Sequence, residues 1–166
     1  MMPKVKQVRT LNISDLHVRA DPGGDDTPAT NVVTGYAAVF DQPTSICDVY
    51  TEKIAPGAFD KTLSTNNDIR ALFNHDTGRV LGRSKAGTLQ LQEDEHGLAF
   101  TLELPDTSTG RDLAVSMQRG DINQCSFGFY PTVEEWDYTD PDNPVDTVRE
   151  VELLEISIVT FPAYEG

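Results

Sequence analysis

Cysteine, histidine and tryptophan are scarce in this sequence of 166 residues, which contains two cysteines, three histidines and one tryptophan. Cys47 and Cys125 make no disulfide framework and match no zinc-binding spacing, so we expect a reducing compartment. No apolar run approaches the length that crosses a membrane, and the N-terminus has no apolar signal core after its lysines. From these absences we expect that the protein is neither secreted nor inserted into a membrane.

Positive charge is also in short supply, because 13 Lys and Arg residues stand against 27 Asp and Glu residues and the formal net charge is -14. Such a chain repels phosphates, so we expect no nucleic acid and no anionic membrane surface as partner. Basic proteins or basic substrate segments are favoured instead. The acidic stretch with Asp140, Asp142 and Asp146 lacks the glycine and terminal glutamate of a calcium loop, and we expect no metal and no cofactor.

The chain divides into a polar front segment and one domain. Residues 1–31 end in turn and linker residues, from Asp21 to Pro28, which predicts a flexible segment with room for one strand around Lys6 to Leu16. Residues 32–166 are numerous and apolar enough to bury one core.

Short β-branched or alternating stretches dominate this domain. The strands that they predict lie at residues 32–40, 47–54, 68–74, 88–92, 98–104, 124–130 and 148–161. We expect helices at residues 56–63 and 111–119, the second ending at Gly120, and a turn with a short strand between Gly78 and Gly82. The pattern favours a mainly β fold, a barrel or closed sheet with a couple of covering helices.

One predicted strand carries a candidate nucleophile. Within residues 124–130, Cys125 and the two phenylalanines face one side, whereas Ser126 and Gly128 face the other. Gly128 leaves space for a substrate backbone beside the Ser126 hydroxyl. Cys125 competes as nucleophile, but the alternation places its thiol in the core. The alternative for Ser126 is an ordinary exposed serine on a half-buried strand.

An acyl-transfer site also needs a base. His17 belongs to the front segment and His96 to an acidic hairpin tip, so His75 is the candidate base. Its position at a strand end beside Asn74 and Asp76 also suits a structural histidine.

The last predicted strand supplies a candidate for the third group. Glu155 shares one face of this strand with Leu153 and Val159, and a buried carboxylate is costly unless it is paired. An imidazole is a natural partner for it. Glu152, on the opposite face, is the fallback, and Glu155 facing solvent or an arginine is the alternative.

Together these features resemble the prohead maturation serine proteases of tailed bacteriophages, which are related in fold to herpesvirus assemblin. The resemblance covers residues 34–164, and its specificity lies in the order and spacing of the pieces. These pieces are Gly35 to Phe40, Ile54 to Phe59, Asn74-His75-Asp76, Leu81-Gly82-Arg83, Gly97-Leu98, Gly120 through Phe129, and Leu154 to Ala163.

The resemblance implies a closed or partly open β-barrel of the herpesvirus-protease type, with a prohead protease domain over residues 32–166. It assigns catalytic roles to His75 and Ser126. The herpesvirus relatives use a second histidine after the serine, and none follows Ser126 here, so Glu155 takes that place by inference. The implied activity is a serine endopeptidase with a Ser-His-acid triad.

The implied substrates are scaffolding segments, N-terminal segments of the capsid protein and the protease itself, cut inside the immature capsid (prohead) in the host cytoplasm. The landmarks reach almost to the last residue, so we expect a truncated or self-processed C-terminus. Analogy with the herpesvirus relatives suggests a homodimer or higher homo-oligomer. Two alternatives are a catalytically silent β-barrel that serves as an internal scaffold or adaptor of the capsid, and a cysteine peptidase acting through Cys125.

Overall fold

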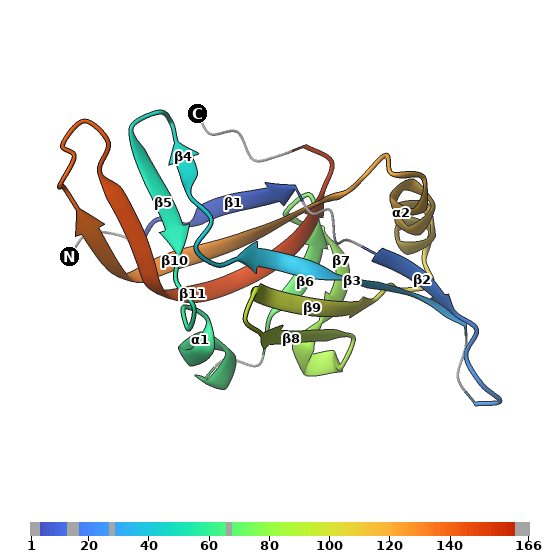
Figure 1. Cartoon of the computed structure of the whole chain (residues 1–166). Coiled ribbons are helices and arrows are strands. Elements are labelled where there is room, and N and C mark those ends of the chain that lie inside the picture. Colours follow the sequence, from blue (N-terminus) through green and yellow to red (C-terminus); the bar gives the residue numbers. More distant parts are fainter. Residues whose placement is uncertain (1–3, 13–16, 27–28, 66–67, 162–166) are drawn as a thin grey trace.

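Two β-sheets make up most of the molecule. The computed structural model describes residues 4–12, 17–26, 29–65 and 68–161 (Figure 1). The larger sheet runs in the order β1 (Gln7–Asn12), β10 (Gln124–Asp137), β11 (Val145–Val159), β5 (Tyr50–Ile54) and β4 (Thr44–Ile46), while β6 (Arg70–Phe73) pairs with β11 and with β7 (Asp76–Arg83). The smaller sheet runs in the order β2 (His17–Asp21), β3 (Thr30–Val39), β9 (Gly97–Glu103) and β8 (Leu89–Glu93).

Two α-helices, α1 (Asp60–Thr65) and α2 (Ser108–Arg119), and a 3₁₀ turn η1 (Ser84–Ala86) complete the described part of the chain. Thr107 caps α2 by accepting a hydrogen bond from the Gly110 amide at 3.2 Å, and the left-handed Gly120 (φ 84°) ends it. The predicted end of this helix is therefore confirmed. Helix α1 begins later than predicted, because the Phe59 amide donates to the Glu93 carboxylate at 3.0 Å instead of entering a helix.

The core lies between the two sheets. Phe127 of β10 packs edge to face on Phe59, with 5.6 Å between the ring centroids, and stacks on Phe129 at 4.9 Å. Phe100 of the smaller sheet is buried in the same cluster. The predicted core face of the 124–130 strand is confirmed, because Cys125, Phe127 and Phe129 are all buried. This packing places the first half of β10 in the core.

The prediction of a mainly β fold is confirmed, but the strand pairing of the described residues gives two sheets and no closed barrel. Long β10 and β11 twist past the smaller sheet in Figure 1, and the register shifts three times along their pairing. Such bulges bend a sheet without requiring its edges to meet.

One local prediction was incomplete and two others need correction. The strand expected around Lys6 to Leu16 is present as β1, but the described part of the front segment also holds β2. The predicted 47–54 strand begins only at Tyr50, because Cys47 and Asp48 form a left-handed turn between β4 and β5. The short strand expected between Gly78 and Gly82 is part of β7, but the turn expected there lies instead at Asn74 and His75.

None of the helices in the described ranges is long and apolar enough to span a membrane. The same ranges contain no cluster of three or more His, Cys, Asp or Glu side chains that could hold a metal ion.

A test of the sheet packing is the substitution Gly97→Ala. A Cβ atom at Gly97 would lie 2.0 Å from the Ala38 carbonyl oxygen of the neighbouring strand, so the backbone must move. We expect a loss of about 2 kcal/mol in the free energy of unfolding, measured by urea denaturation. Gly24→Ala is the control, because nothing lies within 4 Å of its added Cβ, and it should change stability by less than about 0.5 kcal/mol. Equal midpoints for the two variants would contradict the packing described.

Candidate active site

The antiparallel register of β10 and β11 places the predicted site residues side by side. Ser126 pairs with Ser157, and Gly128 pairs with Glu155, so all four side-chain positions share one face of the sheet. The register shifts by one residue between Gly128 and Phe129. This bulge lets Glu155 share the face of Ser126 while Leu153 still enters the core.

His75 reaches this face from a two-residue turn between β6 and β7. Phe73 pairs with Asp76, and both residues between them, Asn74 and His75, have positive φ (53° and 58°), which is the geometry of a type I′ hairpin turn. Glycine usually takes the second position, and a histidine there costs conformational energy. A side chain kept at such a cost points to a functional role.

Hydrogen bonds connect the three predicted residues. Nε2 of His75 lies 2.9 Å from Oγ of Ser126, and Nδ1 of His75 is hydrogen-bonded to Oε1 of Glu155. A carboxylate can only accept, so Nδ1 carries the hydrogen, and a neutral ring of this tautomer presents a lone pair at Nε2. The ring is therefore oriented to accept the Ser126 proton.

Ser157 is a further site residue that the sequence reasoning did not single out. Its Oγ accepts a hydrogen bond from the His75 amide at 3.1 Å and donates one to Oε2 of Glu155 at 2.9 Å. It thereby joins the backbone of the histidine turn to the carboxylate. Its alternation with Glu155 along β11 was the signal in the sequence that could have identified it.

The electrostatics of the site keep Glu155 ionised. Burial by itself raises the pKa of this carboxyl, but the hydrogen bonds from His75 and Ser157 and the nearby Lys6 ammonium outweigh burial, and the pKa lies below its ordinary value. Lys6 Nζ lies 3.2 Å from Oε1 of Glu155. A buried carboxylate paired in this way can balance positive charge on the imidazole.

Cys125 does not belong to the site. Its side chain lies on the opposite face of β10, and burial raises the pKa of the thiol to about 12. A thiol in that state is a poor nucleophile.

The remaining candidates lie elsewhere. Glu152 binds Lys4 at 3.0 Å near the surface, and His96 packs edge to face on Tyr36 at a hairpin tip. The structure brings His75, Ser126 and Glu155 together and leaves Glu152 and His96 apart from them.

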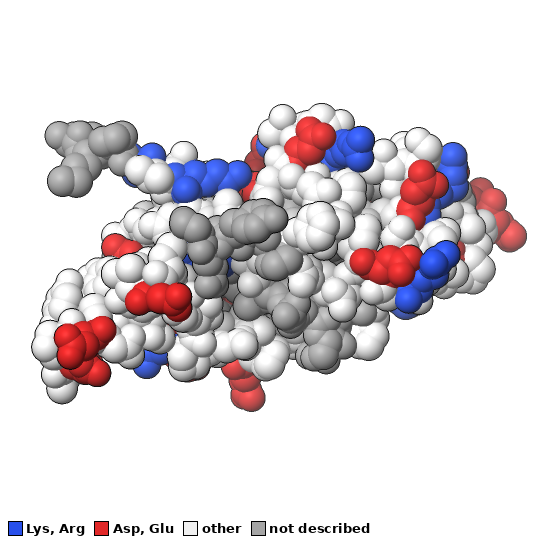
Figure 2. Space-filling view, turned by 90° about the horizontal axis from the view of Figure 1, so that it is seen from above, with Lys and Arg blue, Asp and Glu red and all other residues white. Residues whose placement is uncertain are grey.

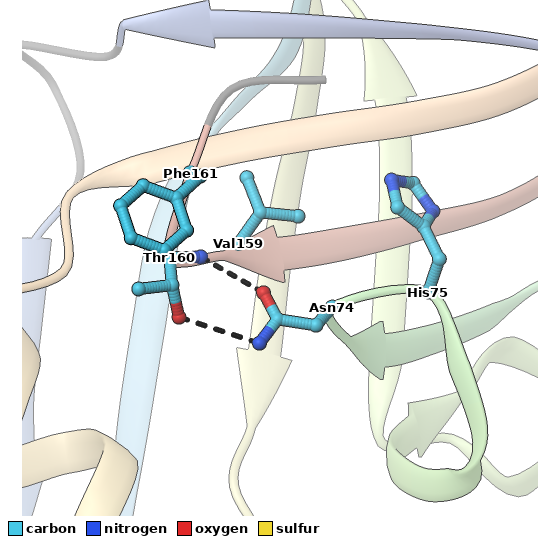
Figure 3. Close-up of a pocket in the computed structure, with 5 residues that line it drawn as sticks. All are labelled: Asn74, His75, Val159, Thr160 and Phe161. Atoms are coloured by element: carbon cyan, nitrogen blue, oxygen red, sulfur yellow. Dashed lines mark hydrogen bonds between the residues drawn. The ribbon is translucent and has the colours of Figure 1, made fainter. Parts of the chain in front are cut away.

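The turn that carries His75 is held by its neighbour. Asn74 donates from its amide to Oγ1 of Thr160 at 3.3 Å and accepts from the Thr160 backbone amide at 2.9 Å, both drawn in Figure 3. Figure 3 also shows the two side chains leaving the turn in different directions, with the His75 ring directed towards β10. A cavity of about 270 Å³ lies beside the turn, lined by Asn74, His75, Val159, Thr160 and Phe161.

Strand β1 covers the nucleophile. Thr10 pairs with Ser126 in an antiparallel ladder, and Ser126 has no exposed surface. Besides His75, its hydroxyl has a second acceptor, the Arg9 carbonyl oxygen at 2.9 Å. The alternative of an ordinary exposed serine therefore does not apply, because Ser126 is buried in this arrangement.

Acidic side chains do not gather in one place on the face of the molecule that Figure 2 shows. On the face shown in Figure 2, acidic and basic side chains are interspersed, several of them next to each other. The net charge of -14 therefore forms no single acidic patch on that face. Recognition of a basic segment would need a local acidic group.

A hydroxyl, an imidazole and a buried carboxylate in this order of contacts is the arrangement of a serine hydrolase. Comparison with known families shows which kind of serine hydrolase the chain resembles. The model of the family described as caudovirus prohead serine protease matches residues 14–166. The chain belongs to this family of serine proteases, which act in the maturation of bacteriophage capsids.

The fold agrees with a solved structure, that of the bacteriophage T4 capsid assembly protease, gp21. The two chains share 8% sequence identity with a TM-score of 0.63, and the match covers 95% of this chain and 98% of that chain. At this identity the likeness concerns the fold alone. Among curated proteins, none matches this chain.

The lowered pKa of Glu155 predicts a pH-dependent contribution to stability. The ionised carboxylate stabilises the native state above the ordinary carboxyl pKa, and this contribution is lost as the pH falls through the lower native pKa. We expect the stability gap between wild type and Glu155→Gln in urea denaturation to be larger at about pH 6 than at about pH 3.

Glu135→Gln is the control for this measurement, because Glu135 pairs with Arg149 at 3.0 Å on the surface. It should give a small gap at both pH values. A Glu155→Gln gap that grows towards acid would contradict the assigned direction.

Proposed function

We propose that this protein is a serine endopeptidase whose triad is Ser126, His75 and Glu155. The single observation that carries the proposal is the unbroken series of hydrogen bonds from the Ser126 hydroxyl through the His75 ring to the Glu155 carboxylate. Membership of the prohead serine protease family agrees with it, although the family match does not by itself assign the residues.

The geometry supports one sequence of steps. His75 takes the Ser126 proton at Nε2 as Oγ attacks the scissile carbonyl carbon, and then gives that proton to the leaving amine. Glu155 fixes the hydrogen on Nδ1 and balances the imidazolium charge. Water, activated by the same ring, hydrolyses the acyl-enzyme. Ser157 acts as a positioning residue, since it holds both the His75 backbone and the Glu155 carboxylate.

The proposed substrates are scaffolding segments or N-terminal segments of the capsid protein inside the prohead, together with the protease itself. The name of the T4 neighbour, a capsid assembly protease, agrees with capsid proteins as substrates. A homodimer or larger homo-oligomer stays a prediction.

The burial of Ser126 favours a second candidate function. A nucleophile without exposed surface is what a catalytically silent internal scaffold or adaptor of the capsid would show. The two functions differ in whether Ser126 reacts.

Reaction with a fluorophosphonate probe tests this difference. The probe should label wild type at Ser126, located by peptide mapping, and should fail to label Ser126→Ala. In peptide hydrolysis, Ser126→Ala and His75→Ala should each lower kcat/KM by about 10⁴-fold or more, because they remove the nucleophile or its base. Glu155→Gln should cost less if the carboxylate only orients the ring.

The control variant is Cys125→Ala, which should keep the labelling of wild type because the thiol faces the core. Labelling that persists in Ser126→Ala would place the nucleophile elsewhere and contradict the triad. Inactivation by iodoacetamide that disappears in Cys125→Ala would support the cysteine peptidase instead.

A further inference from the structure

Strand β1 binds β10 in the way that an extended peptide binds a sheet edge. Six consecutive residues, Gln7 to Asn12, pair antiparallel with Gln124 to Phe129. Strand addition of this kind is a common mode of peptide recognition, in which main-chain hydrogen bonds give affinity and side-chain pockets give selectivity. The strand precedes residues 14–166, which the family model matches.

The backbone of Arg9 lies at the nucleophile. Oγ of Ser126 is 2.9 Å from the Arg9 carbonyl oxygen, so the peptide bond between Arg9 and Thr10 is the one next to the candidate triad. The register agrees, because Thr10 is the residue that pairs with Ser126. Arg9 therefore occupies the place of a substrate residue on the amino side of a scissile bond.

The Arg9 side chain enters an acidic pocket on the other face of the strand. Its Nε and Nη2 bind the two carboxylate oxygens of Glu52 at 2.6 Å and 2.8 Å, and the guanidinium lies 5.5 Å from the centre of the Phe129 ring. Glu52 is only 3% exposed. A planar, two-point contact of this kind matches the guanidinium group and selects it over a simple ammonium.

A second buried carboxylate adjoins this pair. Asp146 pairs with Glu52 in the β11–β5 ladder and has no exposed surface. Neither of its carboxylate oxygens has a hydrogen-bonding partner of ordinary geometry among the described residues. Burial, followed by contact with Glu134, raises the pKa of Asp146 to about 7. Glu52 is therefore the carboxylate that the guanidinium balances, and an apolar side chain in place of Arg9 would leave Glu52 buried without a cation.

We propose that β1 occupies the substrate cleft of this protease, and that Glu52 is the specificity residue of a pocket that selects arginine on the amino side of the scissile bond. This inference rests on the proposed function and adds to it a substrate class, namely extended segments with an arginine at the cleaved position.

The reaction on such a segment is an ordinary hydrolysis. Oγ of Ser126 bonds to the arginine carbonyl carbon, the C–N bond to the next residue breaks, and the proton taken by His75 passes to the released amine. A water molecule then attacks the ester carbon and gives a proton to His75, which passes it to Oγ of Ser126 as the ester bond breaks. This yields a carboxylate on the arginine and restores the Ser126 hydroxyl. One water molecule is consumed for each bond cut.

Occupation by β1 also explains why the site is closed in this conformation. The single hydrogen of the Ser126 hydroxyl has two acceptors, Nε2 of His75 and the Arg9 carbonyl oxygen. When this hydrogen points to the Arg9 carbonyl oxygen, it is not available to Nε2 of His75. A substrate in trans has to displace β1, which Lys6 also anchors through Glu155.

Peptides with the sequence of residues 4–15, carrying a fluorophore and a quencher, test the pocket on the full-length protein. Position 9 is varied as arginine, citrulline and alanine, of which citrulline keeps the shape of arginine without its charge. We expect cleavage after position 9, identified by mass spectrometry, with kcat/KM for arginine about 30-fold or more above that for citrulline.

Glu52→Gln should remove most of this preference, because the variant has lost the carboxylate that holds the guanidinium. Glu135→Gln is the matched control, since Glu135 also pairs with an arginine but is exposed to solvent, and it should retain the preference of wild type. The comparison of arginine with citrulline needs no substitution in the protein, so the test stands if Glu52→Gln fails to fold.

Arg9→Ala tests the occupation of the cleft by β1. The variant loses the ion pair with Glu52 that holds β1 in place, so β1 should leave the site more often. We expect the fluorophosphonate to label Ser126 about tenfold faster than in wild type. Equal labelling rates would overturn the occupation of the cleft.

The failure of this inference differs from the failure of the proposed function. If Ser126 is labelled but arginine and citrulline peptides are cut equally, the pocket is overturned and the protease remains. If Ser126 is labelled in neither wild type nor Arg9→Ala and no peptide is cut, the proposed function itself is overturned.

Discussion

The antiparallel pairing of β10 with β11 is the constraint on which the rest of the structure depends. Its register puts Ser126 opposite Ser157 and Gly128 opposite Glu155, so a hydroxyl and a carboxylate from distant parts of the chain share one face. The other face of the same strands carries the aromatic core, which fixes this register because a slip of one residue would exchange the two faces. Stability and site geometry therefore have the same origin.

Several buried or strained groups in this molecule are explained by the contacts that they make. His75 occupies a left-handed turn position that suits glycine, and its ring lies between Ser126 and Glu155. Glu155 is buried and is balanced by three hydrogen-bonding partners. Glu52 is buried and is balanced only by Arg9 of β1, in the described part of the chain. The first two groups belong to the candidate triad, and the third connects the N-terminal strand to the same region.

The acidic character of the chain and its candidate site fit together through this third group. A net charge of -14 favours basic partners in general, but dispersed surface charge does not choose a peptide bond. A buried carboxylate that binds the arginine beside the nucleophile can choose one, because an ion pair out of water requires a matching partner. The same pocket, filled by a residue of the chain itself, closes the site. In this proposal, the pairing of an arginine with Glu52 accounts both for the selection of a substrate and for the closure of the site by β1.

The sequence by itself determined the mainly β character, the capped helix α2 and the core face of β10, because alternation and caps act locally. With the family resemblance, it also gave the three candidates now proposed for the triad. Only the tertiary structure decided where the histidine turn lies, that Ser157 joins it to Glu155, and that the sheets leave open edges. The pairing of β1 with β10 and of Arg9 with Glu52 was likewise hidden, since 43 positions separate the two charged residues along the chain. Such contacts depend on which strands become neighbours, and residue patterns within a single strand carry no information about its neighbour.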